Sequence, residues 1–341
     1  MRIGNLAPLL ILIPVLTLNA PHLGSAQQHK NGVPLNLVVP SGKGRIIIPA
    51  ASDEIQWQTL TLYDQGTRPV LQTKIKSTEL VVSYALFPNQ TGSSAPNICR
   101  DDIVSAATRS LSPESGMADI RQVKKTDHPS VNGRQIAIGS LFVNSVAGQN
   151  IKQQNLYVVS ASPTLCAEMH ISKALFQSSD DSLLAAQEQT FTFDPDYSPS
   201  AVDYYTMGSI FYNVTRSSES AAIYYQRALD TLPADSPLKF KRVIIDQLAM
   251  SYGISGQIKR SRAVNEEAIK TDPDYPLYYY NLACADAEQG KAADAKIHLQ
   301  QAFDRKANTI PGETLPDPTK DDSFLKLKKN KDFWTFVETL K

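Results

Sequence analysis

The chain has 341 residues, which is enough for two domains of ordinary size. It carries 34 lysines and arginines against 34 aspartates and glutamates, so its formal net charge is zero. This balance argues against a dedicated nucleic-acid-binding protein, because such proteins show a basic excess or a basic stripe. The parts of the chain before and after residue 200 are each close to neutral, so no basic domain is hidden by the average.

The N-terminal residues 1–26 have the order of a secretory signal peptide. Arg2 precedes an apolar run over 6–18, and small residues up to Ala26 form a cleavage site. A transmembrane anchor is the alternative, but the run has about 13 residues, short of the roughly 20 that span a bilayer, and Pro14 interrupts it. We therefore expect cleavage after Ala26, a periplasmic or extracellular location, and no membrane span in the mature chain.

Residues 35–195 alternate between strand-like runs and turn signals, among them the hairpin-forming pair Asn132-Gly133. Two stretches, 97–111 and 180–191, instead carry apolar residues at helical spacing. Strands with two intervening helices predict an α+β domain. The strand-like runs, rich in Val, Ile, Thr, Tyr and Leu, are 45–50, 55–64, 69–76, 80–88, 134–145, 153–162 and 165–172.

After a proline- and serine-rich linker around residues 194–200, alanine, tyrosine, leucine and lysine recur at helical spacing. Ser200 and Asp203 form a capping pair where the first helix is expected to begin. From there the sequence repeats itself at an interval of 34 residues, with an earlier copy that has extra residues in its turn and connection. The matching positions are Leu282, Ala283, Gly290 and Ala302, then Leu248, Ala249, Gly256 and Ala268, and then Met207, Gly208 and Ala228.

A period of 34 residues with this pattern of large, small and turn-forming residues resembles the tetratricopeptide repeat (TPR), in which each copy is a pair of antiparallel helices. The resemblance implies an all-α TPR solenoid over 196–310 that follows the α+β domain. Asp286 departs from the pattern, because an aromatic residue is usual there. So do the polar residues Ser261 and Asn265 and the missing turn glycine of the first copy. The three copies span about 200–233, 237–273 and 276–308.

Residues 311–341 follow the last repeat and are expected to form capping helices. Repeat arrays need such a cap, because the terminal repeat otherwise exposes its apolar face. The residues assigned to the cap are Phe324, Leu325, Leu327, Phe333, Trp334, Phe336 and Leu340.

The three cysteines are Cys99, Cys166 and Cys284. In an oxidising compartment we expect Cys99 and Cys166 to pair, because a helix packed on the sheet of the first domain can bring them together. Two ordinary buried thiols are the alternative. Cys284, beside Ala283 on a closely packed helix, is expected to stay reduced.

No catalytic, cofactor-binding or metal-ligating motif stands out. His170 alternates with a strand pattern, and a lone histidine of this kind is typically a packed side chain rather than a ligand. The sequence at 41–44, SGKG, lacks the earlier glycine and the following serine or threonine of a phosphate loop. We therefore expect no cofactor or metal and name no reaction, although a dispersed active site leaves no local signature.

The leading functional hypothesis is an exported protein-interaction or scaffold module that binds a peptide or partner segment in the concave TPR groove. The expected partner is an apolar or aromatic segment rather than nucleic acid. The alternative is that the chain's own N-terminal domain or C-terminal cap covers the same residues. The groove-facing positions that the resemblance implies are Val202, Tyr205, Ser209, Tyr212, Val243, Asp246, Met250, Ile254, Leu277, Tyr280 and Cys284.

The rival hypothesis is that the N-terminal α+β domain binds a small molecule or is catalytic and that the repeats only position it. A deep polar pocket with converging titratable groups in 35–195 favours this rival, whereas an open groove in 200–310 favours the interaction module.

Overall fold

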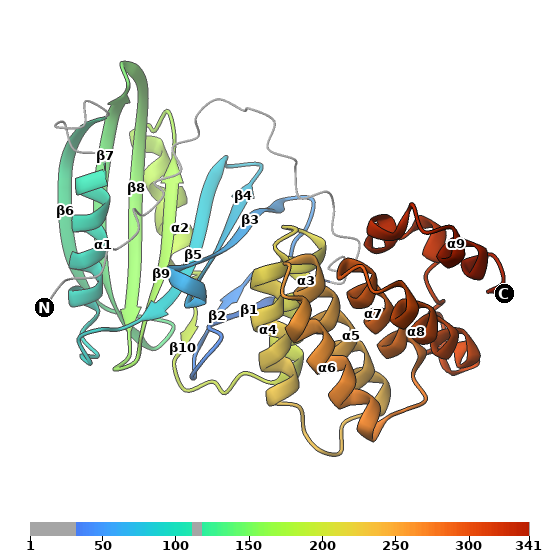
Figure 1. Cartoon of the computed structure of the whole chain (residues 1–341). Helices are drawn as coiled ribbons and strands as arrows, with labels where there is room; N and C mark the ends of the chain where they lie inside the picture. The colour runs from blue at the N-terminus through green and yellow to red at the C-terminus, as the bar shows by residue number, and fades with distance from the viewer. Residues whose placement is uncertain (1–31, 111–117, 341) are drawn as a thin grey trace, which may run out of the picture. The chain divides into compact units, whose positions relative to one another are not determined.

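The computed structural model describes residues 32–110 and 118–340. The chain divides into two compact units. The first unit extends to Pro199 and includes Asn213–Thr215, and the second comprises the rest of the chain from Ser200 onward. Figure 1 shows that the first unit is rich in strands and the second is helical, which confirms the expected fold class.

The candidate signal peptide, residues 1–26, lies outside the described residues. Within 32–110 and 118–340, no helix has the length and apolar character needed to cross a membrane.

The first unit is built on a seven-stranded antiparallel sheet with the strand order β3-β4-β5-β9-β8-β7-β6. β9 is central, and nearly all of its side chains are buried because both faces of the sheet are covered. The strands are β3 (Ile55–Tyr63), β4 (Arg68–Ile75), β5 (Leu80–Pro88), β6 (Ala118–Val131), β7 (Arg134–Val146), β8 (Gln149–Ala161) and β9 (Leu165–Lys173), with a 3₁₀ turn η1 (Asp64–Gly66) between β3 and β4.

Two helices lie on opposite faces of this sheet (Figure 1). Helix α1 (Pro96–Ser110) packs on β7 and β8, where a Cβ atom at Gly139 would overlap Val104 of the helix. Helix α2 (Asp181–Glu188), preceded by the 3₁₀ turn η3 (Ser178–Asp180), packs on β9. A small second sheet with the order β1-β2-β10 also packs on the first unit's strands; its strands are β1 (Leu35–Val38), β2 (Arg45–Ile48) and β10 (Phe193–Asp194).

Strand β6 is the main element that the sequence did not predict. It is an edge strand, and Lys124 and Lys125, which point to opposite faces, are both exposed, so the strand lacks the apolar alternation of a half-buried strand. Its pairing with β7 is interrupted by three irregularities in register. The Asn132-Gly133 turn between these strands is confirmed, because both residues have positive φ angles, 48° and 76°.

The second unit contains three helix pairs, as the repeat predicts. Ser200 and Asp203 cap the first helix reciprocally: the Ser200 amide donates to the Asp203 carboxylate, and the Asp203 amide donates to the Ser200 hydroxyl. The pairs are α3 (Ala201–Asn213) with α4 (Ser218–Asp230), α5 (Leu238–Ile254) with α6 (Ile258–Thr271), and α7 (Pro276–Glu288) with α8 (Ala292–Asp304).

The small and turn-forming positions of the repeat have the roles that the pattern assigns to them. A Cβ atom at Gly208 would lie 2.7 Å from the ring of Tyr225, so only glycine lets α3 approach α4 this closely. Gly256 and Gly290 turn the chain between helices with φ angles of 77° and 73°. The first pair lacks this glycine, and Arg216 takes a positive φ of 57° in its connection.

The chain after α8 closes the last apolar face. Phe324 and Phe333 are fully buried and stack on each other with ring centroids 5.6 Å apart, in one cluster with α7 and α8. The indole N–H of Trp334 donates to the carbonyl of Leu327. The elements of this region are the 3₁₀ turns η4 (Lys306–Asn308), η5 (Pro318–Lys320) and η6 (Asp322–Leu327) and the helix α9 (Lys331–Val337).

Candidate functional site

The residues predicted to face a groove lie on α3, α5 and α7, the first helix of each pair, and we call this set the first-helix face. Contacts link these three helices to one another. Tyr205 of α3 packs edge-on against Phe240 of α5, with ring centroids 5.3 Å apart. Asn281 of α7 donates to the carboxylate of Asp246 of α5 at 2.8 Å.

On α3 and α5 much of this face is open. Val202, Met250 and Ile254 are 59%, 36% and 65% exposed, although all three are large apolar side chains. Isolated exposed apolar residues are common on protein surfaces, but these three lie on the first helices of two consecutive pairs, at positions that the repeat resemblance assigns to the groove. The half-buried residues of the same helices are Tyr205, Ser209, Tyr212 and Val243.

Asp246 is the buried charge-bearing residue of this face, with 8% of its surface exposed. Burial, with a smaller contribution from the nearby carboxylate of Glu313, raises the pKa of its carboxyl group to about 6, although hydrogen bonds from Asn281 and Gln247 lower it. Burial also raises the pKa of the Tyr212 hydroxyl, with added contributions from the carboxylates of Asp246 and Asp321.

On α7 the face is covered by the chain itself. Leu277 and Tyr280, assigned to the groove from the sequence, are only 8% and 2% exposed. The segment over them is residues 309–321, which connect η4 to η6 and which we call the strap. Tyr275 donates its hydroxyl to Glu313 of the strap at 2.9 Å, and Tyr280 donates to Asp321 at 3.0 Å.

The strap was the part of this site that sequence reasoning missed. Its sequence, rich in proline, threonine and acidic residues, was assigned to the terminal cap, and nothing in its spacing indicates which face it crosses. Its acidic residues are the one feature that could have indicated this contact, because tyrosine hydroxyls that are buried at α7 need hydrogen-bond acceptors.

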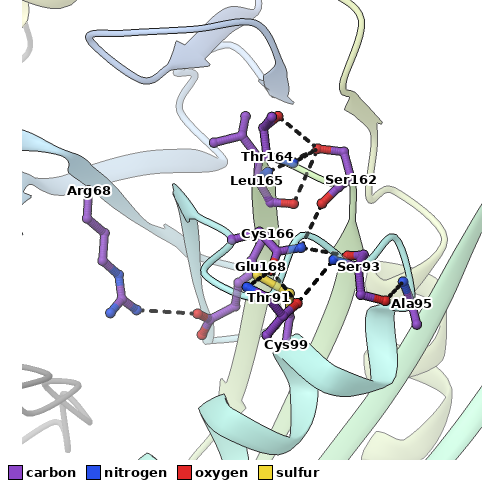
Figure 2. Close-up of a disulfide and its surroundings, with 11 residues drawn as sticks. Arg68, Thr91, Ser93, Ala95, Cys99, Ser162, Thr164, Leu165, Cys166 and Glu168 are labelled. Atoms are coloured by element: carbon purple, nitrogen blue, oxygen red, sulfur yellow. Dashed lines mark hydrogen bonds and ion pairs between the residues drawn. A yellow bond between two sulfur atoms is a disulfide. The ribbon is translucent and has the colours of Figure 1, made fainter. Parts of the chain in front are cut away.

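The first unit holds the disulfide that the sequence predicted. Cys99 in the first turn of α1 is bonded to Cys166 of β9, with their Cα atoms 6.0 Å apart (Figure 2). Cys284 on α7 is a free thiol. Beside the disulfide, Figure 2 shows the buried ion pair between Arg68 of β4 and Glu168 of β9, whose closest N–O distance is 3.5 Å.

A row of buried polar side chains continues from this ion pair along the same face of the sheet. His170 stacks on Tyr157 with ring centroids 4.4 Å apart, and its Nε2 atom lies 3.0 Å from the side-chain oxygen of Asn155. Burial lowers the pKa of His170 to about 4, so the ring is neutral at pH 7. Burial raises the pKa of the Glu168 carboxyl group, and the nearby positive charge of Arg68 acts in the opposite direction. His170 is thus a packed, hydrogen-bonded histidine, as expected.

The first unit also has a surface cavity of about 630 Å³ at one end of its strands. The titratable residues that line it are Lys43, Arg134 and Asp196, and Arg134 and Asp196 form an ion pair at 3.5 Å. All three side chains are exposed, and the Arg68–Glu168 pair is not part of the lining. In the described residues, no cluster of three or more histidine, cysteine or acidic side chains forms a candidate metal site.

No protein-family model matches the chain, and no curated protein matches it. Among solved structures, the chain is similar to the crystal structure of the Sgt2 TPR domain from Aspergillus fumigatus. The two are 18% identical, the match covers 41% of this chain and 83% of that chain, and the TM-score is 0.30. The helix pairs themselves, with their 34-residue interval and turn glycines, give the second unit its TPR-like form.

Proposed function

We propose that this protein is an exported interaction module whose first-helix face binds a segment of a partner protein. The observation that carries the proposal is the contrast between equivalent repeat positions. Val202 is 59% exposed and Val243 is half-buried, whereas Leu277, at the same position of the third pair, is 8% exposed. The strap covers Tyr280 of the third pair, whereas Val202, Met250 and Ile254 leave part of the same face of the first two pairs open to bind another segment.

The exposed side chains suit an apolar or aromatic partner residue. Burying one such side chain contributes about 1.5–3 kcal/mol, and a few aromatic or aliphatic anchors typically dominate binding at an interface. Tyr205 and Tyr212 add half-buried aromatic rings with polar hydroxyl ends, a residue type enriched at interfaces.

The test is to change Val202, Met250 and Ile254 together to serine in the full chain and to recover partners from the exported fraction. All three are exposed, so helix content by circular dichroism should be unchanged while partner recovery falls. The matched control is Ile297→Ser on α8, an apolar residue that is 56% exposed and outside the first-helix face. Undiminished recovery with the triple variant, or equal loss with the control, contradicts the proposal.

Export is supported by the charged, apolar and small-residue order of residues 1–26. Intact-mass analysis of protein from its native host should show a chain that begins after Ala26. A mature chain that retains Met1 contradicts cleavage.

Small-molecule binding by the first unit is the second candidate, favoured by the 630 Å³ cavity with Lys43 and Arg134 in its lining. These cations suit a ligand with an anionic group. A thermal-shift screen of small carboxylates and phosphates should give a stabilisation that Lys43→Ala abolishes. If no compound stabilises the wild-type chain, this candidate is wrong.

A further inference from the structure

The strap makes polar contacts at the N-cap of α7 and at two positions within the helix. At the N-cap the Tyr275 hydroxyl donates to Glu313, and in the second turn of the helix the Tyr280 hydroxyl donates to Asp321. The thiol of Cys284, one turn beyond Tyr280, lies 3.7 Å from the same Asp321 carboxylate. The strap therefore lies along α7 from its N-cap to Cys284.

Few of the strap's own side chains are buried. Pro318 is buried and Ile310 and Leu315 are partly buried against the α7 cluster, while most other strap side chains are exposed. The strap's regular structure is the single turn η5, so no ladder of backbone hydrogen bonds holds it. A segment with so few buried contacts opens at a small fraction of the free energy of global unfolding.

The tyrosines beneath the strap determine what can replace it. Tyr275 and Tyr280 are 0% and 2% exposed, and both of their hydroxyls donate to strap carboxylates. A replacement segment without acceptors would leave two buried donors unsatisfied, which costs more than two average hydrogen bonds contribute. Carboxylates are the strongest acceptors for such donors.

We propose that the first-helix face of α7 binds an extended acidic segment of the partner in place of the strap. The segment carries two carboxylates that accept from Tyr275 and Tyr280 and a leucine or proline between them, as Glu313, Leu315 and Asp321 do in the strap. This inference rests on the proposed function and adds the chemistry of the partner. The strap is then the chain's own occupant of the site, and partner binding includes its displacement.

The first experiment measures how the strap is held, with Cys284 as the reporter. The other two cysteines form the disulfide, so iodoacetamide labelling of the native full chain reports on Cys284 alone. Tyr275→Phe/Tyr280→Phe keeps both rings but removes both donors, and it should accelerate labelling about tenfold or more, because hydrogen bonds to charged groups are the strong ones. Tyr279→Phe is the matched control, because its hydroxyl donates to the Pro273 carbonyl and not to the strap. An unchanged labelling rate in the double variant overturns the inference.

The second experiment tests the chemistry of the partner segment. The probe is a fluorescein-labelled synthetic peptide of residues 309–322, added to the full chain with Glu313→Ala/Asp321→Ala, whose own strap can no longer accept from the tyrosines. It should bind at least tenfold more tightly than the same peptide with glutamine and asparagine at positions 313 and 321. Equal affinity of the two peptides, or no binding of either, overturns the inference.

The interaction module and the acidic partner segment can be refuted independently. If serine at positions 202, 250 and 254 abolishes partner recovery but the acidic peptide does not bind, the interaction module stands and the acidic partner segment is wrong. If the peptide binds but partner recovery is unaffected, the proposed binding on α3 and α5 is wrong.

Discussion

The disulfide of the first unit offers the most quantitative prediction. Cys99 and Cys166 are separated by 67 residues, and both are buried, at 2% and 4% exposure. In the chain-entropy model, a cross-link that closes a loop of this length stabilises the fold by about 4 kcal/mol, because it restricts the unfolded chain. The bond also ties α1 to the central strand β9 of the sheet. Its reduction should therefore remove a large fraction of a stability that for single domains is only 5–15 kcal/mol.

The assay is urea unfolding of the full chain with and without dithiothreitol, in a Cys284→Ser background that prevents exchange with the third thiol. The chain has two tryptophans, and Trp334→Phe leaves Trp57 of the first unit as the reporter. Reduction should lower the unfolding free energy of the first unit by about 4 kcal/mol, whereas Trp334 fluorescence in a Trp57→Phe background should show no comparable loss for the helical unit. A loss below about 1 kcal/mol in the first unit would refute the reasoning from loop length.

Two further predictions concern the helical unit, followed by Trp334 fluorescence in the Trp57→Phe background. Asp246 has a folded-state pKa of about 6 against an ordinary 3.8, so the stability it contributes is complete below pH 3.8 and is lost as the pH rises through 6. Asp246→Asn should therefore stabilise the unit by roughly 3 kcal/mol at pH 8 and by little at pH 4, and an equal effect at both pH values contradicts this. Asp286, which is fully buried, accepts from Arg262 and lies 2.6 Å from Nδ1 of His298. Asp286→Ala should cost roughly 3–5 kcal/mol, because it leaves Arg262 and His298 without their buried partner. Asp286→Phe loses the same ion pair and should cost a similar amount; a much smaller cost for phenylalanine would show that the lost ion pair is not the cause.

The helical half was the more predictable part, because its repeat is redundant. Gly256 and Gly290 recur at the same repeat position, and each needs the positive φ that its helix turn requires. Gly208 similarly marks the close approach of α3 to α4. Local chemistry repeated at a fixed interval specifies a helix pair each time, so the three pairs follow from the sequence.

In the α+β half, the strands with apolar alternation were predictable and β6 was not. An edge strand that is exposed and carries lysines has no buried face, so its sequence shows no alternation of apolar and polar residues. Its pairing with β7 is determined instead by the hairpin turn at Asn132-Gly133. The pairing of Cys99 with Cys166 was inferable because helix and strand belong to one domain, although no local pattern specifies their distance.

The candidate site was predictable in part. The positions of Val202, Met250 and Ile254 on the first helices follow from the repeat register. The burial of Tyr280 does not, because it depends on the path of the strap, whose sequence has no helical or strand period. Long-range contacts of an irregular segment leave no periodic signal in a single sequence.

The central claim is that the first-helix face contacts a partner protein, and site-specific photo-crosslinking tests it most directly. The full chain, with p-benzoylphenylalanine in place of Met250 in one sample and of Ile297 in the other, is irradiated in the exported fraction of its native host. Both side chains are exposed, but only Met250 lies on the first-helix face. The account predicts a discrete crosslinked species at position 250 and none at 297. A crosslink at 297 without one at 250 would contradict it.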